Sequence, residues 1–406
     1  MTRTHCISRP ALAILGLLIS ASLGACKLDG IIGPTSGCFI LCDGIGPIGP
    51  LPDPPHTSVP TRVSGDRAYV DLAMTDLGTC AITEAGETWC WGVLPPAGNS
   101  VLVPTLLSTP IRFRTLVAGG DHFCGLGLAG GTYCWGANGW RLLGTEDSLN
   151  YQIALPSRVA GGDSLVQLST TGLEWDRSAR CGVTASRRAF CWGWNDAGQL
   201  GRDTAGTEGR VPAEVVGANA FVSIHVAPRA TCALDDVGAA WCWGVTGLGL
   251  TGTNTLPNER DTPGRVSGGH TFSAIAVGAY HACGIEGGTV WCWGDEFSGA
   301  LGPRTGRIDP EPRRMLGLPS ASKLFIHQGG SCVVDGEGAA ACWGASNYLG
   351  AAGVPDSVNT ASPFTVQTTT RFSKLVLRSG SSCGLDLEGR AWCWGRSDLG
   401  RLGNGT

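Results

Sequence analysis

The stretch that decides the fold is residues 383–395, CGLDLEGRAWCWG, in which two cysteines ten residues apart are followed by Trp and Gly. The chain holds seven copies of this unit, 44 to 57 residues apart, with the cysteine pairs Cys80/Cys90, Cys124/Cys134, Cys181/Cys191, Cys232/Cys242, Cys283/Cys292, Cys332/Cys342 and Cys383/Cys393. A repeat of this length is typical of solenoids, propellers and related arrays. The chain is therefore expected to form one large repeat domain.

The spacing inside each copy predicts a β-hairpin. If Cys80 pairs with Cys90 across two antiparallel strands, Ala81 pairs with Trp89 and a three-residue loop ends at Gly86. Such a loop needs a left-handed residue in its last position, which glycine supplies without strain. Glycine stands at this place in five copies, at Gly86, Gly130, Gly238, Gly338 and Gly389.

Two copies depart from this spacing. The fifth has one residue fewer between Cys283 and Cys292, which leaves the two-residue loop Gly287-Gly288, suited to a type I′ turn. The third has Arg187 where the other loops have glycine, so a strained or remodelled turn is expected there. The turn chemistry thus changes with the spacing while the cysteines keep their register.

The paired register predicts a disulfide within each of the seven hairpins. Directly opposed residues on antiparallel strands have Cα atoms about 4.5–5.5 Å apart, within disulfide range. One alternative is seven pairs of free, buried thiols. Metal binding is another, but a cysteine pair in one hairpin lacks the second ligand pair of a tetrahedral zinc site.

Two further apolar segments accompany each hairpin. An aromatic residue stands eleven residues before the first Cys in five copies, with Leu or Ile three residues later, and Ala321 replaces it in the sixth. Nine residues before that position comes a Pro followed by an apolar residue, as in Pro60 and Val63. Four short strands per copy predict the blade of a β-propeller. The Pro strand is expected outermost, with Pro as its first residue, because a missing N–H matters least there.

Several copies continue after Trp-Gly as residues 192–201 do, WGWNDAGQLG, and His122 and His281 stand two residues before their cysteines. These motifs resemble the regulator of chromosome condensation repeat family, over residues 60–406. The resemblance implies a seven-bladed, all-β propeller of four-stranded antiparallel blades. A structural hydrogen-bonding role is expected for the two histidines. The cysteine pair in every blade departs from the family and suggests an exported branch.

The ends of the chain predict how the ring closes. The seventh copy is not followed by a P-x-x-V segment, whereas Pro60 and Val63 precede the inner strand of the first blade. Residues 60–65 are therefore expected to supply the outer strand of the last blade. The propeller would then be closed by an N-terminal outer strand.

Residues 1–25 indicate a lipoprotein signal peptide. Arg3 and Arg9 precede a short apolar stretch, residues 11–23, whereas a membrane-spanning helix needs about 20 apolar residues. Residues 23–26, LGAC, resemble a bacterial lipobox, which implies cleavage before Cys26 and its lipidation. The alternative is an ordinary signal peptide that leaves Cys26 as a free thiol. Lys27 rather than Asp follows, which by the same resemblance implies an outer-membrane, cell-envelope location.

Residues 26–59 are expected to carry the lipidated Cys and a tether, with the propeller over residues 60–406. The segment is rich in Gly and Pro, which favours an extended, semi-rigid chain. It also contains Cys38 and Cys42. A local disulfide between them is preferred to a metal site, because only His56 lies nearby as a further ligand.

Composition and motifs exclude several function classes. The net charge is −4, charged residues make up 15%, and no basic tract is present, so nucleic-acid binding has no electrostatic support. No P-loop, nucleophile elbow, Rossmann fingerprint or metal-ligand spacing occurs, so no cofactor, metal or catalytic residue is predicted. Catalysis would need carboxylates to meet across one face, and solvated loop positions are the preferred interpretation for the candidates Glu174, Asp176, Asp235, Asp236, Asp295 and Glu296.

The third copy breaks the repeat most strongly. It has extra residues before Cys181, in STTGLEWDRSAR at 169–180, and follows a long connection, GTEDSLNYQIAL at 144–155. These departures place candidate binding residues of hot-spot type in one neighbourhood, namely Trp140, Tyr151, Trp175 and Arg177.

We therefore expect a non-catalytic, membrane-tethered protein-binding scaffold with an unidentified protein partner. A polysaccharide is the weaker candidate ligand. A eukaryotic member of the family uses a wedge to contact a small nuclear GTPase, but no matching wedge motif occurs here, so nucleotide exchange is not carried over. The alternative function is an envelope hydrolase or lyase with its site at the axial mouth of the propeller.

Overall fold

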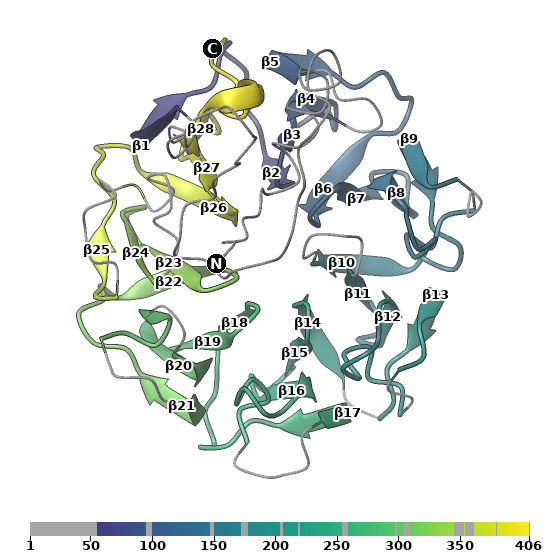
Figure 1. Cartoon of the computed structure of the whole chain (residues 1–406), viewed down its shortest axis with the longest axis vertical. Helices are drawn as coiled ribbons and strands as arrows, with labels where there is room; N and C mark the ends of the chain where they lie inside the picture. The colour runs from purple at the N-terminus through teal and green to yellow at the C-terminus, as the bar shows by residue number, and fades with distance from the viewer. Residues whose placement is uncertain are drawn as a thin grey trace, which may run out of the picture. The chain divides into compact units, whose positions relative to one another are not determined.

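Seven four-stranded antiparallel sheets form the blades of a β-propeller (Figure 1). The computed structural model describes residues 55–94, 100–146, 150–171, 178–203, 206–217, 220–253, 259–296, 299–303, 308–344, 353, 361–378 and 380–405. A short 3₁₀ helix, η3 (Asp398–Gly400), follows the last strand. Within the described residues no helix is long and apolar enough to cross a membrane.

Each blade runs in chain order from an inner to an outer strand. Blades 1 to 4 consist of β2 (Asp71–Met74), β3 (Gly78–Ile82), β4 (Thr88–Val93), β5 (Ser100–Leu106); β6 (Phe113–Ala118), β7 (His122–Gly127), β8 (Thr132–Ala137), β9 (Gln152–Arg158); β10 (Leu165–Thr170), β11 (Ala179–Thr184), β12 (Ala189–Gly193), β13 (Gly209–Glu214); and β14 (Phe221–Val226), β15 (Ala230–Asp235), β16 (Ala240–Val245), β17 (Glu259–Arg265). Blades 5 to 7 consist of β18 (Ala274–Val277), β19 (His281–Glu286), β20 (Thr289–Asp295), β21 (Ile308–Arg314); β22 (Ala321–His327), β23 (Gly330–Asp335), β24 (Ala340–Gly344), β25 (Phe364–Thr365); and β26 (Phe372–Arg378), β27 (Ser381–Asp386), β28 (Ala391–Arg396) with β1 (His56–Arg62).

The N-terminal strand closes the ring, as the sequence predicts. β1 is the outer strand of blade 7 and pairs with β28, with His56 opposite Arg396 and Arg62 opposite Trp392. The strand begins at His56, four residues before the expected start at Pro60. The two ends of the folded domain therefore lie in one sheet, and opening the ring requires breaking a β-ladder.

The hairpin registers are those the spacing predicts. Cys80 lies opposite Cys90, and Gly86 adopts a positive φ of 76°. In the fifth blade Gly287 and Gly288 have φ of 55° and 81°, the signs of a type I′ turn. Arg187 keeps the glycine conformation, with φ of 63°, which confirms a strained turn.

All seven predicted hairpin disulfides are present in the structure, and each cross-links the second and third strands of a blade. The bonded pairs are Cys80–Cys90, Cys124–Cys134, Cys181–Cys191, Cys232–Cys242, Cys283–Cys292, Cys332–Cys342 and Cys383–Cys393. All fourteen side chains are buried. The alternatives of free thiols and of metal binding at these cysteines are therefore set aside. Cys26 and the predicted Cys38–Cys42 disulfide lie outside the described residues.

The separation expected within these pairs needs a correction. Their Cα atoms lie 4.0 to 4.2 Å apart, closer than the expected range. In the first hairpin Thr83 donates its N–H to the Glu87 carbonyl over 3.0 Å, which makes that pair a hydrogen-bonded one. Hydrogen-bonded and non-hydrogen-bonded pairs alternate along an antiparallel ladder, so Cys80 and Cys90 occupy a non-hydrogen-bonded position, where Cα atoms approach more closely.

The Pro strands are outermost, but the expectation that Pro begins the strand is wrong. Pro60 lies inside β1 and Pro104 inside β5, each where the pairing register shifts by a bulge. A bulge accommodates a residue without N–H in mid-strand, because the ladder is interrupted there. Proline also blunts an outer edge that would otherwise accept a foreign strand.

In five copies of the repeat the Trp of the Trp-Gly pair bonds to a neighbouring blade, which the sequence did not reveal. Trp243 of blade 4 is fully buried, and its indole N–H donates to the Gln199 carbonyl of blade 3 over 2.9 Å. Equivalent bonds of 2.9 to 3.1 Å join Trp91 to Arg401, Trp192 to Leu143, Trp293 to Leu250 and Trp343 to Ala300. The Trp91 bond spans blades 1 and 7, so it also closes the ring.

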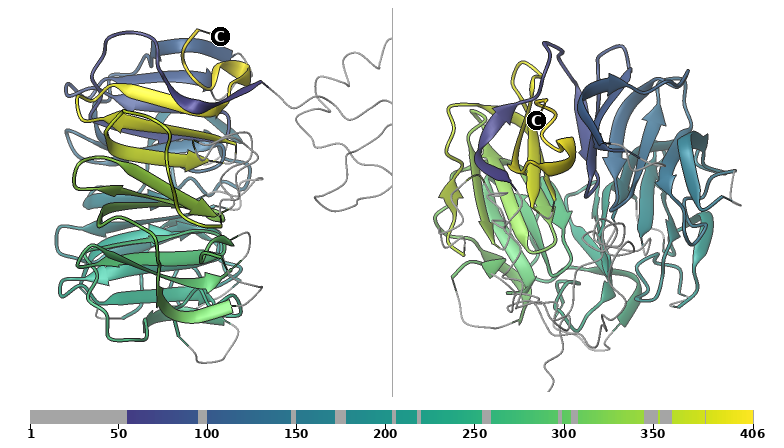
Figure 2. Two further views of the ribbon diagram at one scale, coloured as in Figure 1. Left: turned by 90° about the vertical axis from the view of Figure 1, so that its left-hand side faces the viewer. Right: turned by 45° about the horizontal axis from the view of Figure 1, so that its top comes forward.

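The alternation of strands gives the propeller two different faces (Figure 2). The hairpin face carries the tight turns between second and third strands and the links between blades. The loop face carries the turns after the inner strands and the connections from third to outer strands. β1 enters from the loop face, because His56 pairs with the last residue of β28.

Candidate functional site

The departures from the repeat in blades 2 and 3 fall on the loop face. Trp140 and Tyr151 lie in the connection between β8 and β9, and residues 172–177 lie between β10 and β11. Trp175 and Arg177 belong to that second connection and lie outside the described residues. Thr171 donates its N–H to the Ala179 carbonyl over 3.2 Å, which closes the base of the connection.

Trp140 and Tyr151 are the exposed members of an aromatic patch, which also contains the half-buried Arg141 and Trp194. Trp140 is 49% exposed and Tyr151 63% exposed, so much of each ring is open to a partner. The rings of Trp140 and Trp194 are 5.8 Å apart, and the Arg141 guanidinium lies 5.4 Å from the Tyr151 ring. The structure thus adds Arg141 and Trp194 to the predicted set, and the repeat position of Trp194 after Trp-Gly was the available signal.

The asparagine of the W-G-x-N motif shapes the connection that carries the patch. Asn138 donates its side-chain amide to the Asn150 carbonyl over 2.9 Å, and its Oδ1 accepts the Leu143 N–H over 3.1 Å. Its backbone N–H donates to the Tyr151 carbonyl over 2.7 Å. Both ends of the connection are therefore held by one residue, which limits the motion of the exposed rings.

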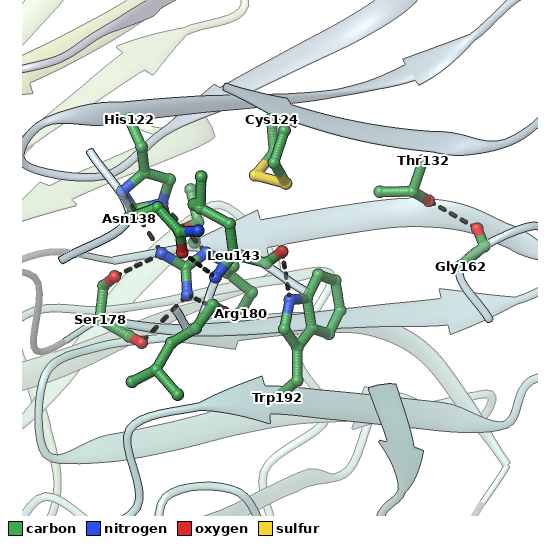
Figure 3. Close-up of a disulfide and its surroundings, with 12 residues drawn as sticks. His122, Cys124, Thr132, Asn138, Leu143, Gly162, Ser178, Arg180 and Trp192 are labelled. Carbon is green, nitrogen blue, oxygen red and sulfur yellow. Dashed lines mark hydrogen bonds between the residues drawn. A yellow bond between two sulfur atoms is a disulfide. The ribbon is translucent and has the colours of Figure 1, made fainter. Parts of the chain in front are cut away.

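A buried arginine beneath the patch joins three segments of the loop face (Figure 3). Arg180 is 2% exposed and stands directly before Cys181, where other blades have small or apolar residues such as Thr79 and Thr231. Its Nη1 donates to the Leu142 carbonyl over 2.8 Å, and its Nη2 donates to Ser178 Oγ over 2.6 Å.

The same guanidinium reaches blade 2 through a histidine. Arg180 Nε donates to His122 Nε2 over 3.2 Å, and that nitrogen lies 2.9 Å from the Thr170 hydroxyl. Arg180 therefore connects the β6–β7 turn, the β8–β9 connection and the residue that follows 172–177. Sequence reasoning missed it, although its unlikeness to Thr79 and Thr231 was visible.

The cysteine pairs predicted as site residues belong to the scaffold rather than to this patch. In blade 2 the Cys124–Cys134 disulfide lies at the centre of the β7–β8 ladder, and in blade 3 Cys181–Cys191 lies at the centre of β11–β12. Both are fully buried. They fix the strands from which the patch connections leave and offer no surface to a partner.

The two motif histidines have the structural role expected of them. Burial, followed by the charges of Arg180 and Arg378, holds the pKa of His122 well below its usual value. His281 is buried, which lowers its pKa to about 4, and its Nε2 lies 2.6 Å from the Ser331 hydroxyl of the next blade. Both rings are therefore neutral at pH 7 and bridge adjacent blades.

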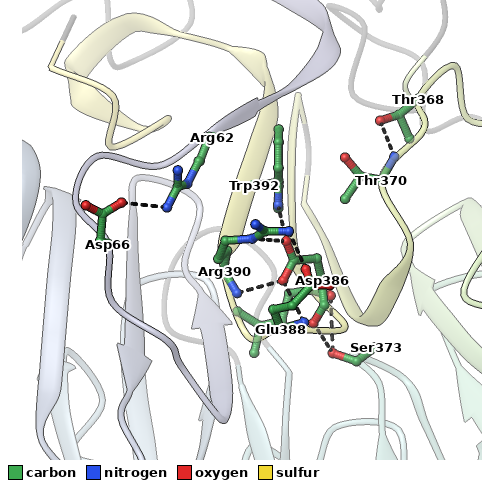
Figure 4. A network of polar contacts seen from close by, with 10 residues as sticks. Arg62, Asp66, Thr368, Thr370, Ser373, Asp386, Glu388, Arg390 and Trp392 are labelled. Carbon is green, nitrogen blue, oxygen red and sulfur yellow. Dashed lines mark hydrogen bonds and ion pairs between the residues drawn. The ribbon is translucent and has the colours of Figure 1, made fainter.

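The described carboxylates considered for catalysis divide between the two faces, while Glu174 and Asp176 lie outside the described residues. Asp235 caps a turn on the hairpin face, accepting the Ala239 N–H over 2.8 Å and the Trp241 indole N–H over 2.9 Å. Asp386 does the same in blade 7 for Arg390 and Trp392 (Figure 4). Asp295 ends β20 on the opposite, loop face. These hairpin aspartates are structural caps.

The axial channel is the place expected for the alternative site of a hydrolase or lyase. Inner strands enclose a cavity of about 340 Å³, and its described lining residues include no carboxylate. Among the described residues no group of three or more His, Cys, Asp or Glu side chains could hold a metal ion. The exposed patch on blades 2 and 3 is therefore the better-supported candidate site.

A closed ring of seven four-stranded blades with these faces defines a seven-bladed β-propeller. Residues 188–234 match the family model described as the Regulator of chromosome condensation (RCC1) repeat. With six further copies of the same motifs around the ring, the chain is an RCC1-type propeller.

Comparison with known proteins agrees with this assignment. The chain is 27% identical to the mitochondrial RCC1 domain-containing protein RUG3 of Arabidopsis thaliana over 59% of each chain. It is 26% identical to human E3 ubiquitin-protein ligase HERC2 over 59% of this chain but 5% of HERC2. The chain thus spans less than two thirds of either relative.

Solved structures share the fold at low sequence identity. Human WBSCR16 has a TM-score of 0.69 at 18% identity, covering 84% of this chain and 90% of that one. Yeast RCC1 (Prp20), solved bound to Kap60, has a TM-score of 0.64 at 18% identity, covering 81% of each chain. At such identities the likeness is one of fold alone.

Proposed function

We propose that the protein is a non-catalytic scaffold that binds a partner protein through the loop face of blades 2 and 3. The observation that carries this proposal is the exposed aromatic patch, which lies where the repeat is interrupted. Trp, Tyr and Arg are enriched among the few residues that supply most of the binding energy in protein interfaces. Here Trp140, Arg141 and Tyr151 occur together on one exposed connection.

The patch is also held in place before any partner arrives. Asn138 fixes both ends of the connection, and Arg180 ties its Leu142 carbonyl to blade 3. A surface that is ordered in the free protein loses less conformational entropy on binding. This arrangement suits recognition by a preformed surface.

The fold supports a binding role more than a catalytic one. Yeast RCC1 (Prp20) has been solved bound to Kap60, and the structure of Prp20p from Saccharomyces cerevisiae is described with its binding properties to Gsp1p and histones. We transfer to this chain the general role of a protein-binding propeller, and none of those partners.

We further propose that a lipid on Cys26 anchors the propeller to the cell envelope, at the outer membrane. The support is the signal-like residues 1–25 and the lipobox-like LGAC at 23–26. The segment between the lipidated Cys and the described domain, residues 27–54, is 28 residues long. At about 3.1 Å per residue, an extended Pro-rich segment of that length reaches about 90 Å. That reach leaves room for a partner even though β1 enters from the loop face.

The binding proposal is tested by capture from envelope extract on immobilised propeller, with two double variants compared. Trp140→Ala with Tyr151→Ala removes the patch, while Leu128→Ala with Leu387→Ala removes side chains of similar exposure on the hairpin face. We expect the first pair to lose a protein that wild type and the second pair retain. Equal capture by all three proteins would refute the proposed surface.

The anchor is tested separately by fractionation. Wild type is expected in the membrane fraction with a labelled fatty acid, and Cys26→Ser in the soluble envelope fraction without it. A Cys26→Ser protein that remains membrane-bound and labelled would contradict lipidation at this cysteine.

A further inference from the structure

The axial channel is lined by cationic side chains that neither the repeat nor the proposed binding surface explains. Its cavity of about 340 Å³ is lined by residues of all seven inner strands, and the two charged groups among its described lining residues are Lys374 and Arg378. A smaller cavity at the loop-face end, of about 70 Å³, is again lined by Arg378 and by no carboxylate among the described residues. The lining therefore carries positive charge only.

Polar groups without protein partners face this cavity from several blades. Arg378 donates its Nε to the Met74 carbonyl over 2.6 Å and its Nη2 to the Ala118 carbonyl. Its Nη1 has no acceptor within the described part of the chain. The ring nitrogens of His225 and His327, which also line the cavity, make no hydrogen bond to any described residue. Donors are thus left over in a partly buried space.

The nearby carboxylates interact with the cations of the channel. Asp71, which pairs with Lys374, also accepts the backbone N–H groups of Leu72 and Leu116, each over 2.9 Å. Burial lowers the pKa of Arg378, and the charges of Asp76 and Asp121 oppose that effect. None of these three aspartates is among the residues that line the cavity.

The hairpin-face end of the channel is also cationic. Arg114 and Lys323 lie near the start of their inner strands and donate to backbone carbonyls of the next blade, Leu165 over 2.9 Å and Ser373 over 2.6 Å. Lys374 lies at the same end of β26. An anion entering from this face would meet three cations, of which Lys374 is paired with Asp71, whereas the loop-face rim carries Asp76 and Asp121.

We propose that the axial channel binds a small oxyanion, a carboxylate or a phosphate, held at its loop-face end by Arg378 with the imidazoles of His225 and His327. A guanidinium matches the paired oxygens of either anion, and such charge-assisted hydrogen bonds are stronger than neutral ones. The cavity volume suits a small anion.

The test is thermal unfolding of the intact disulfide-bonded protein with phosphate in one arm, citrate in another, and sodium chloride at matched ionic strength as reference. A ligand that binds only the folded state raises the melting temperature in proportion to the logarithm of its concentration. We expect a saturable rise with at least one oxyanion and none with chloride. The two arms identify which oxyanion class is preferred.

Two variants and one control locate the site. Arg378→Gln is expected to weaken the apparent affinity at least tenfold, and His327→Phe several-fold while leaving the Arg378 bonds to blades 1 and 2 intact. Arg371→Gln removes an exposed arginine outside the channel and should bind as wild type does. No oxyanion-specific rise in wild type, or an unchanged rise in both channel variants, would overturn the proposal.

Discussion

The contact between Gly201 and Trp243, where blades 3 and 4 meet, gives the sharpest test of how the ring is held together. Gly201 closes the W-G-x-N-x-x-G-x-L-G segment with φ of 66°, and a Cβ at this position would lie 2.8 Å from Trp243 Nε1 and 2.9 Å from Val215 Cγ1. Gly206, a few residues later, has φ of 81°, but a Cβ there would meet nothing within 4 Å. Comparing an alanine substitution at Gly201 with one at Gly206 therefore separates the cost of backbone strain from the cost of crowding.

The magnitudes follow from these contacts. A left-handed conformation costs a non-glycine residue about 1–2 kcal/mol, and both Gly201→Ala and Gly206→Ala incur it. Overpacking a filled core adds about 1–3 kcal/mol, and only Gly201→Ala incurs that cost, because Trp243 is fully buried and bonded to Gln199. We therefore expect Gly201→Ala to be the less stable variant by about 1–3 kcal/mol.

The assay is denaturant unfolding of both variants with disulfides intact, followed by tryptophan fluorescence. Hydrogen exchange at residues 195–201 and 240–245 would show whether the loss is localised at the seam between blades. Equal destabilisation by the two substitutions would refute the idea that the motif glycine makes room for the tryptophan of the next blade.

Three further predictions concern single side chains. Arg180→Thr introduces the residue found at this position in blades 1 and 4 and should leave the propeller folded. Tryptic cleavage after Arg141 should become several-fold faster, because the Leu142 carbonyl loses its hydrogen-bond donor. An unchanged cleavage rate would contradict the positioning role of Arg180. Arg187→Gly should relieve the strain of a positive φ, which costs about 1 kcal/mol, but it also removes the small contribution of the exposed ion pair with Asp236. The free energy of unfolding in urea should therefore stay unchanged or rise. A marked decrease would show that the strain is compensated. Burial lowers the pKa of His281 to about 4. The stability that neutral His281 contributes is therefore complete above the unfolded-state pKa near 6.5 and is lost as the pH falls toward 4, by up to about 3 kcal/mol. The urea midpoint should fall less between pH 6.5 and 4 in His281→Asn than in wild type. Parallel pH profiles of the two proteins would contradict this prediction.

The blade could be predicted from sequence because its constraints are local. The Cys80–Cys90 register sets every other pair in the hairpin, and Gly287-Gly288 shows the turn changing with the spacing. A slip of one residue would move each side chain to the opposite face of the sheet. Local turn chemistry and alternation therefore specify the strand order within a blade.

Contacts between blades could not be read in this way. The acceptor for Trp243 is a backbone carbonyl, Gln199, in a different copy of the repeat, and nothing in its residue type marks it. The faces to which Asp235 and Asp295 belong depend on strand direction, which is why they seemed able to meet. For the candidate surface, Trp140 and Tyr151 are exposed as a binding role requires, while Trp175 and Arg177 stay predictions.

The central claim, that the loop face of blades 2 and 3 binds a protein, is tested most directly by photo-crosslinking in intact cells. A benzophenone amino acid is placed at position 140 on the loop face, or at position 128, which is 54% exposed on the hairpin face. We predict one discrete protein adduct from position 140, reduced when Arg180→Thr is combined with it, and none from position 128. Equal adducts from both positions, or none from position 140, would contradict the account.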